Sequence, residues 1–299
     1  MKVLRWITRG LLAIAGILVV AMAAIYARTE WQARRIVAIP PRAQLVVSND
    51  SATLARGKHV VTTMGGCADC HGADLGGNVL VDEPLVMRLA APNLTTGKGG
   101  VLPKYDDAAL EAAIRHGVAP GGRVLRFMPS HELSGLADDH VASIIAYLRA
   151  LQPVDKAVPP MTVGPLARVL AVAGQLVLFP YDRIDHAKRP PAVAPVGATP
   201  EHGQYIAAGC IGCHGDGLSG GKIPGAPPDW PAAANITPTG IGAWSEVEFI
   251  RTIRTGVNPA GHALNPVMPW KQMAQMTDDE LRALRMYLAT VTPRPNGTR

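Results

Sequence analysis

The sequence that decides the fold is GGCADCHGADLGG, Gly65–Gly77. It holds two cysteines three positions apart, Cys67 and Cys70, followed directly by His71. This spacing is compatible with a metal site, a redox-active disulfide or a covalently attached haem. A closely similar stretch, AGCIGCHGDGLSGG, occupies Ala208–Gly221, so any interpretation has to explain why the motif occurs twice.

The repeat extends well beyond the cysteine motif. LEAAIRHGVAPGG, residues 110–122, matches FIRTIRTGVNPAG, residues 249–261, at nearly the same distance from the motif. The segments 128–151 and 268–291 also match, each beginning with a Met-Pro pair. A self-similar unit of about 100 residues indicates two copies of one domain. We expect these at 50–152 and 198–292.

Covalent haem attachment explains the duplicated motif best. A zinc site needs four ligands, and two cysteine pairs in separate domain copies do not provide them together. A thioredoxin-type dithiol belongs to an α/β fold, for which the sequence offers no strand pattern. We therefore predict two covalently attached haem c groups, with histidine as the proximal iron ligand. The predicted residues are Cys67, Cys70 and His71 for one haem, and Cys210, Cys213 and His214 for the other.

A methionine is expected as the second axial ligand of each iron, because haem iron commonly takes Met or His there. Of ten methionines, Met128 and Met268 are the pair that coincides when the two copies are aligned, and a proline follows each. The histidines of the two copies outside the motifs align with residues that are not usual haem ligands. The iron ligands predicted from the sequence are thus His71, Met128, His214 and Met268.

The fold class predicted from the sequence is all-α. Each copy should begin with a short helix leading into the cysteine motif, at about 54–65 and 200–209. A middle helix should start near Asp106 or Ser245, residue types that favour helix starts. A last helix with apolar residues at helical spacing should start near Asp138 or Thr277.

An apolar segment near the N-terminus predicts a membrane anchor. Residues 10–27 contain no charged residue and are just long enough to cross a bilayer, with Lys2, Arg5 and Arg9 before them. We favour an uncleaved signal anchor with a cytoplasmic N-terminus at 1–9 and a linker at 28–49. Cleavage near Ala21, as in a signal peptide, is the alternative, and both interpretations send the rest of the chain across the membrane.

The remaining segments are a Pro-rich linker at 153–197 and a short tail at 293–299. The middle of the linker, 166–179, is apolar but too short for a span. It predicts a helix lying on the membrane or against a partner, or else one buried between the domains. Both haem segments are mildly acidic, with nine basic and eleven acidic residues in 50–152. The chain lacks the basic stripe of a nucleic-acid site, so we expect no nucleic-acid partner.

The motifs quoted above, with PNLT or NIT after the haem motif and AYL or MYL in the last helix, resemble the class I cytochrome c family twice over. They look like the cytochrome c subunits of membrane-bound bacterial dehydrogenases. The resemblance implies that the first and last helices of each domain cross beside the haem. It places Gly57 opposite Tyr147, Gly203 opposite Tyr287, and the carbonyl of Pro92 near the proximal histidine.

The expected function is that of a membrane-anchored periplasmic di-haem cytochrome c. It would carry electrons from a periplasmic dehydrogenase to the respiratory chain, with an oxidase or a soluble cytochrome as acceptor. The expected location is the bacterial inner membrane, in contact with lipid and with the haem domains in the periplasm. The alternative is a di-haem enzyme that acts directly on a small substrate such as peroxide or a sulfur compound.

Overall fold

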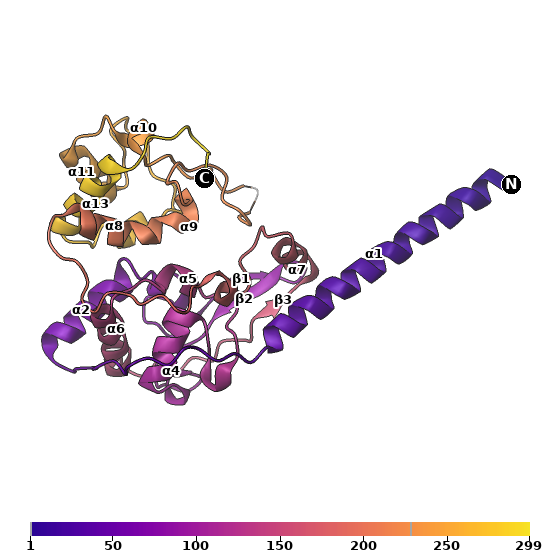
Figure 1. Cartoon of the computed structure of the whole chain (residues 1–299), viewed down its shortest axis with the longest axis horizontal. Helices are drawn as coiled ribbons and strands as arrows, with labels where there is room; N and C mark the ends of the chain where they lie inside the picture. Colours follow the sequence, from indigo (N-terminus) through magenta and orange to yellow (C-terminus); the bar gives the residue numbers. More distant parts are fainter. Residues whose placement is uncertain (1, 228) are drawn as a thin grey trace.

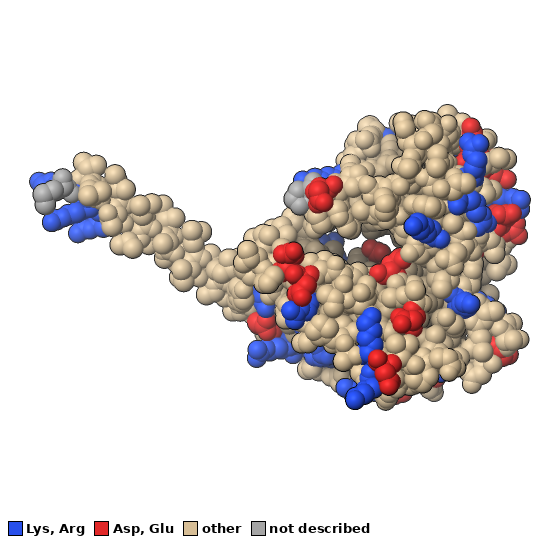
Figure 2. All heavy atoms as spheres, turned by 180° about the vertical axis from the view of Figure 1, so that it is seen from behind, with Lys and Arg blue, Asp and Glu red and all other residues tan. Residues whose placement is uncertain are grey.

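The chain forms two lobes and one long helix that leaves them, as seen in a computed structural model describing residues 2–227 and 229–299 (Figure 1). This helix, α1 (Lys2–Arg34), contains a window with a mean hydropathy of 2.4 that is not buried at all. Its length and composition would allow it to cross a membrane. Lys and Arg gather at its free tip, while the shaft beyond them is uncharged (Figure 2). The expected span, 10–27, lies within it.

The first domain is framed by α2 (Ser51–Thr62) and α6 (Asp138–Ala150), which pack against each other. Asp50 caps α2 by accepting a hydrogen bond from the amide of Thr53. Buried aliphatic side chains of both helices, including Val60 and Ile145, form the core. The elements between them are α3 (Cys67–His71), β1 (Asn78–Glu83), β2 (Met87–Ala91), η1 (Leu102–Lys104), α4 (Asp107–Glu111), the π-helix η2 (Ala112–His116), η3 (Pro120–Gly122) and α5 (Ser130–Leu133).

A small antiparallel sheet corrects the expectation of an all-α fold. Strands β1 and β2 form a hairpin, and β3 (Thr162–Val163) from the linker pairs with β2. The sequence of β1, NVLVDE, carries three consecutive apolar residues instead of an alternating pattern, and five of its six residues are exposed. A strand without one buried face gives no period of two, which is why the sequence did not predict it.

The second domain repeats the frame with α8 (Pro200–Ala207) and α13 (Asp278–Thr290). Its middle and last helices both begin with a capping box, Ser245 with Glu248 and Thr277 with Glu280. Within its described residues, strand pairing is limited to isolated bridges. The elements between the frame helices are η5 (Ala208–Cys210), α9 (Ile211–His214), α10 (Pro238–Ile241), α11 (Glu246–Thr255) and α12 (Trp270–Met273).

A glycine lets the two frame helices of each domain touch. A Cβ on Gly57 would lie 2.0 Å from the carbonyl oxygen of Ser143, and a Cβ on Gly203 would lie 1.9 Å from that of Ala283. The same hypothetical atoms would also press against the Cβ atoms of Tyr147 and Tyr287. The structure therefore confirms the contacts implied by the family resemblance, at nearly identical distances in both domains.

The linkers wrap around the first domain. The amide of Val37 donates to Gly122, and the amide of Phe127 donates to Leu178. The apolar middle of 153–197 forms a helix of eight residues, α7 (Pro165–Val172), followed by a short turn, η4 (Pro180–Arg183). Helix α7 packs on the base of α1, where Arg168 contacts Thr29 and Glu30. This segment lies mainly against α1 and the first domain, and its end at Gln175 also meets Gly225 of the second domain.

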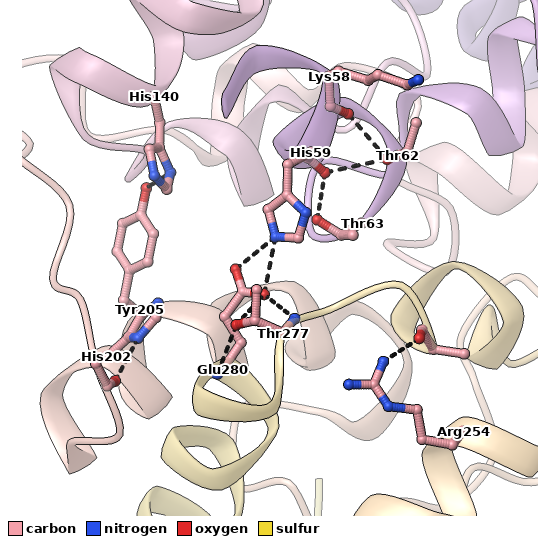
Figure 3. A network of polar contacts seen from close by, with 12 residues as sticks. Lys58, His59, Thr62, Thr63, His140, His202, Tyr205, Arg254, Thr277 and Glu280 are labelled. Carbon is pink, nitrogen blue, oxygen red and sulfur yellow. Dashed lines mark hydrogen bonds and ion pairs between the residues drawn. The ribbon is translucent and has the colours of Figure 1, made fainter. Parts of the chain in front are cut away.

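The two domains meet through contacts that are equivalent under the internal repeat. Nε2 of His59 lies 2.8 Å from Oε1 of Glu280, and the hydroxyl of Tyr205 lies 2.9 Å from Nδ1 of His140 (Figure 3). His59 and Tyr205 each stand two residues after the crossing glycine. His140 and Glu280 each occupy the third position of the last helix. The domains are thus related by a pseudo-two-fold axis, like the subunits of a symmetric dimer.

A second equivalent pair involves the cysteine motifs. Nε2 of Gln272 lies 2.5 Å from Oδ1 of Asp69, within the motif of the first domain. In the reverse direction α5 contacts η5, and a Cβ on Gly212 would lie 2.4 Å from Oε1 of Glu132. Glu132 and Gln272 each follow the methionine of their own Met-Pro pair by four residues. Each cysteine motif therefore faces the segment after the Met-Pro pair of the other domain.

Replacing Gly203 by alanine should destabilise the second domain, because the new Cβ would overlap the backbone of α13. Overpacking of this kind costs about 1–3 kcal/mol. Thermal unfolding of Gly203→Ala against the parent chain measures it. Gly135→Ala is the matched control, since nothing lies within 4 Å of a Cβ at that position. Equal midpoints for the two variants would contradict the contact.

The bond between His59 and Glu280 should make stability depend on pH. The Glu280 carboxylate raises the pKa of His59 above its ordinary 6.5. The contribution of His59 to the free energy of unfolding is therefore complete below pH 6.5 and is lost as the pH rises through its pKa in the folded protein. Burial opposes ionisation of Glu280, but hydrogen bonds from His59 and Thr277 outweigh it and lower its pKa below 4.5. The contribution of Glu280 to the free energy of unfolding is present above pH 4.5 and is lost as the pH falls through its pKa in the folded protein.

The expected result is a difference in unfolding free energy between the parent and His59→Gln that is largest between pH 4.5 and 6.5. Denaturant titrations across this range and up to alkaline pH measure it. His262→Gln, at an exposed position outside the interface, provides the control. A difference that stays constant from pH 5 to pH 9 would show that the pair is not ionic.

Candidate haem sites

A cavity in the first domain brings the predicted residues together. Cys67, Cys70 and His71 line one part of it, and Met128 also lines it. The rest of the lining is mainly aliphatic and comes from β2, η1, α4, η2 and α6, with Leu80 of β1 as well. The four residues predicted from the sequence therefore share one apolar cavity, although 57 positions separate His71 from Met128.

The second domain contains the equivalent cavity. Cys210, Cys213, His214 and Met268 line it together, with apolar side chains of α10, α11 and α13 around them. Each cavity also has a further methionine in its lining, Met161 in the first and Met273 in the second. The sequence did not single these out because they do not correspond in the repeat: one lies in the linker and the other in α12.

Each motif histidine is oriented by a backbone carbonyl. Nδ1 of His71 lies 2.8 Å from the carbonyl oxygen of Pro92, and Nδ1 of His214 lies 2.7 Å from that of Ala234. Since a carbonyl can only accept, Nδ1 carries the proton and Nε2 is the free lone pair. Pro92 was expected in this role from the resemblance. Ala234 was not, although a backbone carbonyl does not depend on the residue type.

The same local turns position both carbonyls. Leu75 and Leu218 both have φ 55°, a left-handed conformation that is uncommon for leucine. Their carbonyls accept from the amides of Leu94 and Ile236. The side chains of Asn93 and Asn235 then accept from the amides two residues further on, at 2.9 Å in both domains. These bonds fix the chain directly after the carbonyl that holds each histidine.

The charge states in the cavities suit a haem. Burial raises the pKa of the Cys67 and Cys210 thiols to about 12, so both are neutral thiols. Burial lowers the pKa of His71 and His214, which keeps both imidazoles neutral and able to bind a metal. Among the described residues, no three His, Cys, Asp or Glu side chains gather into a metal site.

The arrangement therefore fits haem c. In each domain two neutral thiols, a neutral imidazole held through Nδ1 and a thioether line the same cavity. The other side chains that line it are mostly apolar. The other histidines of the domains do not line either cavity. Nδ1 of His116, the last residue of η2, for example, lies 2.9 Å from Nδ1 of His186, which follows η4 in the linker. His140 faces Tyr205 in the interface.

Comparison with known proteins gives two matching segments. The family model described as cytochrome c matches residues 54–152 and 201–292. The chain is 26% identical over 283 residues to the cytochrome c subunit of a quinone-dependent alcohol dehydrogenase from Gluconacetobacter polyoxogenes. It is 24% identical over 270 residues to the cytochrome subunit of fructose dehydrogenase from Gluconobacter japonicus.

These matches cover 82% and 80% of this chain, but only 57% and 52% of the two relatives. The chain thus spans about half the length of these curated relatives. A shorter match, 36% identical over 96 residues, covers 29% of the chain and 22% of the cytochrome c subunit of gluconate 2-dehydrogenase from Pantoea cypripedii.

Cytochromes c carry electrons on a haem that is covalently bound through the C-x-x-C-H motif. The family model covers both segments that contain this motif, and these segments make up most of the chain. The cavities described above supply the matching chemistry in both domains. The chain belongs to the cytochrome c family.

Proposed function

We propose that the chain is a membrane-anchored di-haem cytochrome c that accepts electrons from a dehydrogenase and passes them towards the respiratory chain. The observation that carries this proposal is the pair of equivalent cavities, each lined by two cysteines, a carbonyl-bound histidine and a methionine. A single cavity would serve an isolated carrier, whereas two cavities in domains that contact each other would provide a relay within one chain.

The residues have the following proposed roles. Cys67 and Cys70 would attach the first haem, and His71 and Met128 would bind its iron. Cys210 and Cys213 would attach the second haem, and His214 and Met268 would bind its iron. When bound, haem c supplies one-electron chemistry between Fe(III) and Fe(II). The thioether ligands favour a higher reduction potential than a second histidine would, as suits a carrier in respiration.

The domain interface supports transfer between the two sites. Each cysteine motif faces the segment after the Met-Pro pair of the other domain, through Asp69 with Gln272 and Glu132 beside Gly212. The cysteines that would attach each haem thus belong to a segment that faces the other domain. The bonds of His59 and Tyr205 hold this arrangement, so transfer would not require the linker to swing.

The relatives and α1 support the remaining parts of the proposal. Cytochrome subunits of alcohol, fructose and gluconate dehydrogenases resemble this chain, which favours a dehydrogenase as electron donor. An oxidase or a soluble cytochrome would be the acceptor. Helix α1 would anchor the protein in the cytoplasmic membrane, with both haem domains on the periplasmic side.

Haem content and ligation test the site. The protein from cells with a haem c assembly system should contain two haems per chain, and Cys67→Ser with Cys70→Ser should leave one. Met128→Ala and Met268→Ala should each remove about half of the near-infrared Fe(III)–Met band, because each iron loses its thioether. The other cavity methionines supply the controls, Met161→Ala and Met273→Ala. Loss of the band in a control variant would reassign the ligand.

Isolation from native membranes tests the partner. A dehydrogenase should co-purify with the full chain, and adding its substrate under anaerobic conditions should reduce both haems. Replacing α1 with a cleavable signal peptide, which keeps export, should release the complex from the membrane without changing the haem content. Rapid turnover of peroxide or thiosulfate by the purified chain alone would instead favour the di-haem enzyme.

A further inference from the structure

The two cavities differ in one charged residue. The described residues that line the two cavities include a single Asp, Glu, Lys or Arg side chain. This residue is Arg126, and it lines the first cavity. It stands two positions before Met128, in the segment that brings this methionine to the cavity. The two sites are otherwise built from the same cysteines, histidine, carbonyl and methionine. A fixed charge in only one of them makes the sites electrostatically unequal.

The backbone identifies the equivalent residue in the second domain. The amide of Leu125 donates to the carbonyl of Gly117, and the amide of Leu264 donates to that of Gly256, both at 2.7 Å. The residues that follow, Arg126 and Asn265, therefore occupy the same place. Asn265 also lines its cavity, but it is neutral, and its Oδ1 accepts from the amide of Val267.

Arg126 has no partner for its charge within the described part of the chain. It is half-buried, and no hydrogen bond or ion pair there involves its guanidinium. An arginine stays protonated at neutral pH. A cation removed from water without an anion is unfavourable. Glu30 is the carboxylate that acts on Arg126 electrostatically, but it is paired with Arg168 and Arg34 and makes no ion pair with Arg126. The charge of Arg126 is therefore left without a direct anionic partner among the described residues of the first cavity.

We propose that Arg126 binds a carboxylate of the first haem, one of its two propionates, and so makes the first haem the stronger oxidant of the pair. This inference rests on the proposed di-haem function. The match is chemical: a planar guanidinium pairs with a carboxylate through two parallel hydrogen bonds. Oxidation of the iron adds a positive charge to the haem. A nearby fixed cation opposes that change and raises the reduction potential.

The direction of electron flow follows from this difference. Electrons entering at the second domain would move to the first, where Arg126 stabilises the reduced state. The donor would then dock at the second domain and the acceptor at the first. The internal repeat alone does not indicate which haem has the higher reduction potential or which domain receives the electrons first, because it makes the two sites alike.

A redox titration of the full-length protein tests the inference. The two reduction waves are followed through the visible spectrum in the parent, in Arg126→Gln and in Arg126→Lys. In Arg126→Gln the higher wave should fall by about 59 mV, which is a tenfold change in the ratio of oxidised to reduced haem. Arg126→Lys should restore most of it. The lower wave should move far less.

Arg123→Gln is the matched control. It removes the same charge three positions earlier, from an exposed side chain that does not line the cavity, and should leave both waves in place. A stable Fe(III)–Met band in each variant would show that Met128 is still bound. Unmoved waves in Arg126→Gln, equal shifts in both waves, or a shift confined to the lower wave would overturn the inference. Absence of any haem band from the parent would instead overturn the proposed function.

Discussion

The close contact between the first and last helices of each domain sets the position of everything around the cavities. Gly57 and Gly203 let the backbones of α2 and α8 touch those of α6 and α13, with no side chain between them. At this distance a helix pair has little freedom to slide or rotate, because any methyl group would meet a carbonyl. The cysteine motif follows the first helix and the Met-Pro segment precedes the last. The distance between the cysteine motif and the Met-Pro segment, which line opposite parts of each cavity, therefore depends on the close helix contact that one glycine allows.

The sequence was sufficient to find the cysteines, histidines and paired methionines of the cavities because each of them carries its chemistry in its side chain. The spacing of Cys67, Cys70 and His71 is a signal in itself, and Met128 stood out through its counterpart Met268. The carbonyl of Ala234 could not be found in this way. Its role is carried by the backbone, and the turn that positions it depends on the conformations of Leu218 and Asn235.

Other features escaped sequence analysis for different physical reasons. Strand β1 is exposed on both faces and so has no hydrophobic period, and β3 belongs to a segment that reads as a linker. The bond of His59 to Glu280 joins residues 221 positions apart, and its counterpart joins Tyr205 to His140. Because these equivalent pairs differ in residue type, aligning the two copies conceals their relationship. Only their arrangement in space reveals it.

The pseudo-two-fold interface has an evolutionary consequence. Contacts that are repeated in reverse between two identical domains are the geometry of a homodimer. The chain has the form of a dimer of one-cavity domains joined in tandem, with residues 153–197 as the connecting segment. Joining in tandem keeps the partners at a high effective concentration, so the interface need not be strong enough to assemble by itself. It also frees the two halves from being identical. Divergence could then assign different tasks to sites that began as the same site.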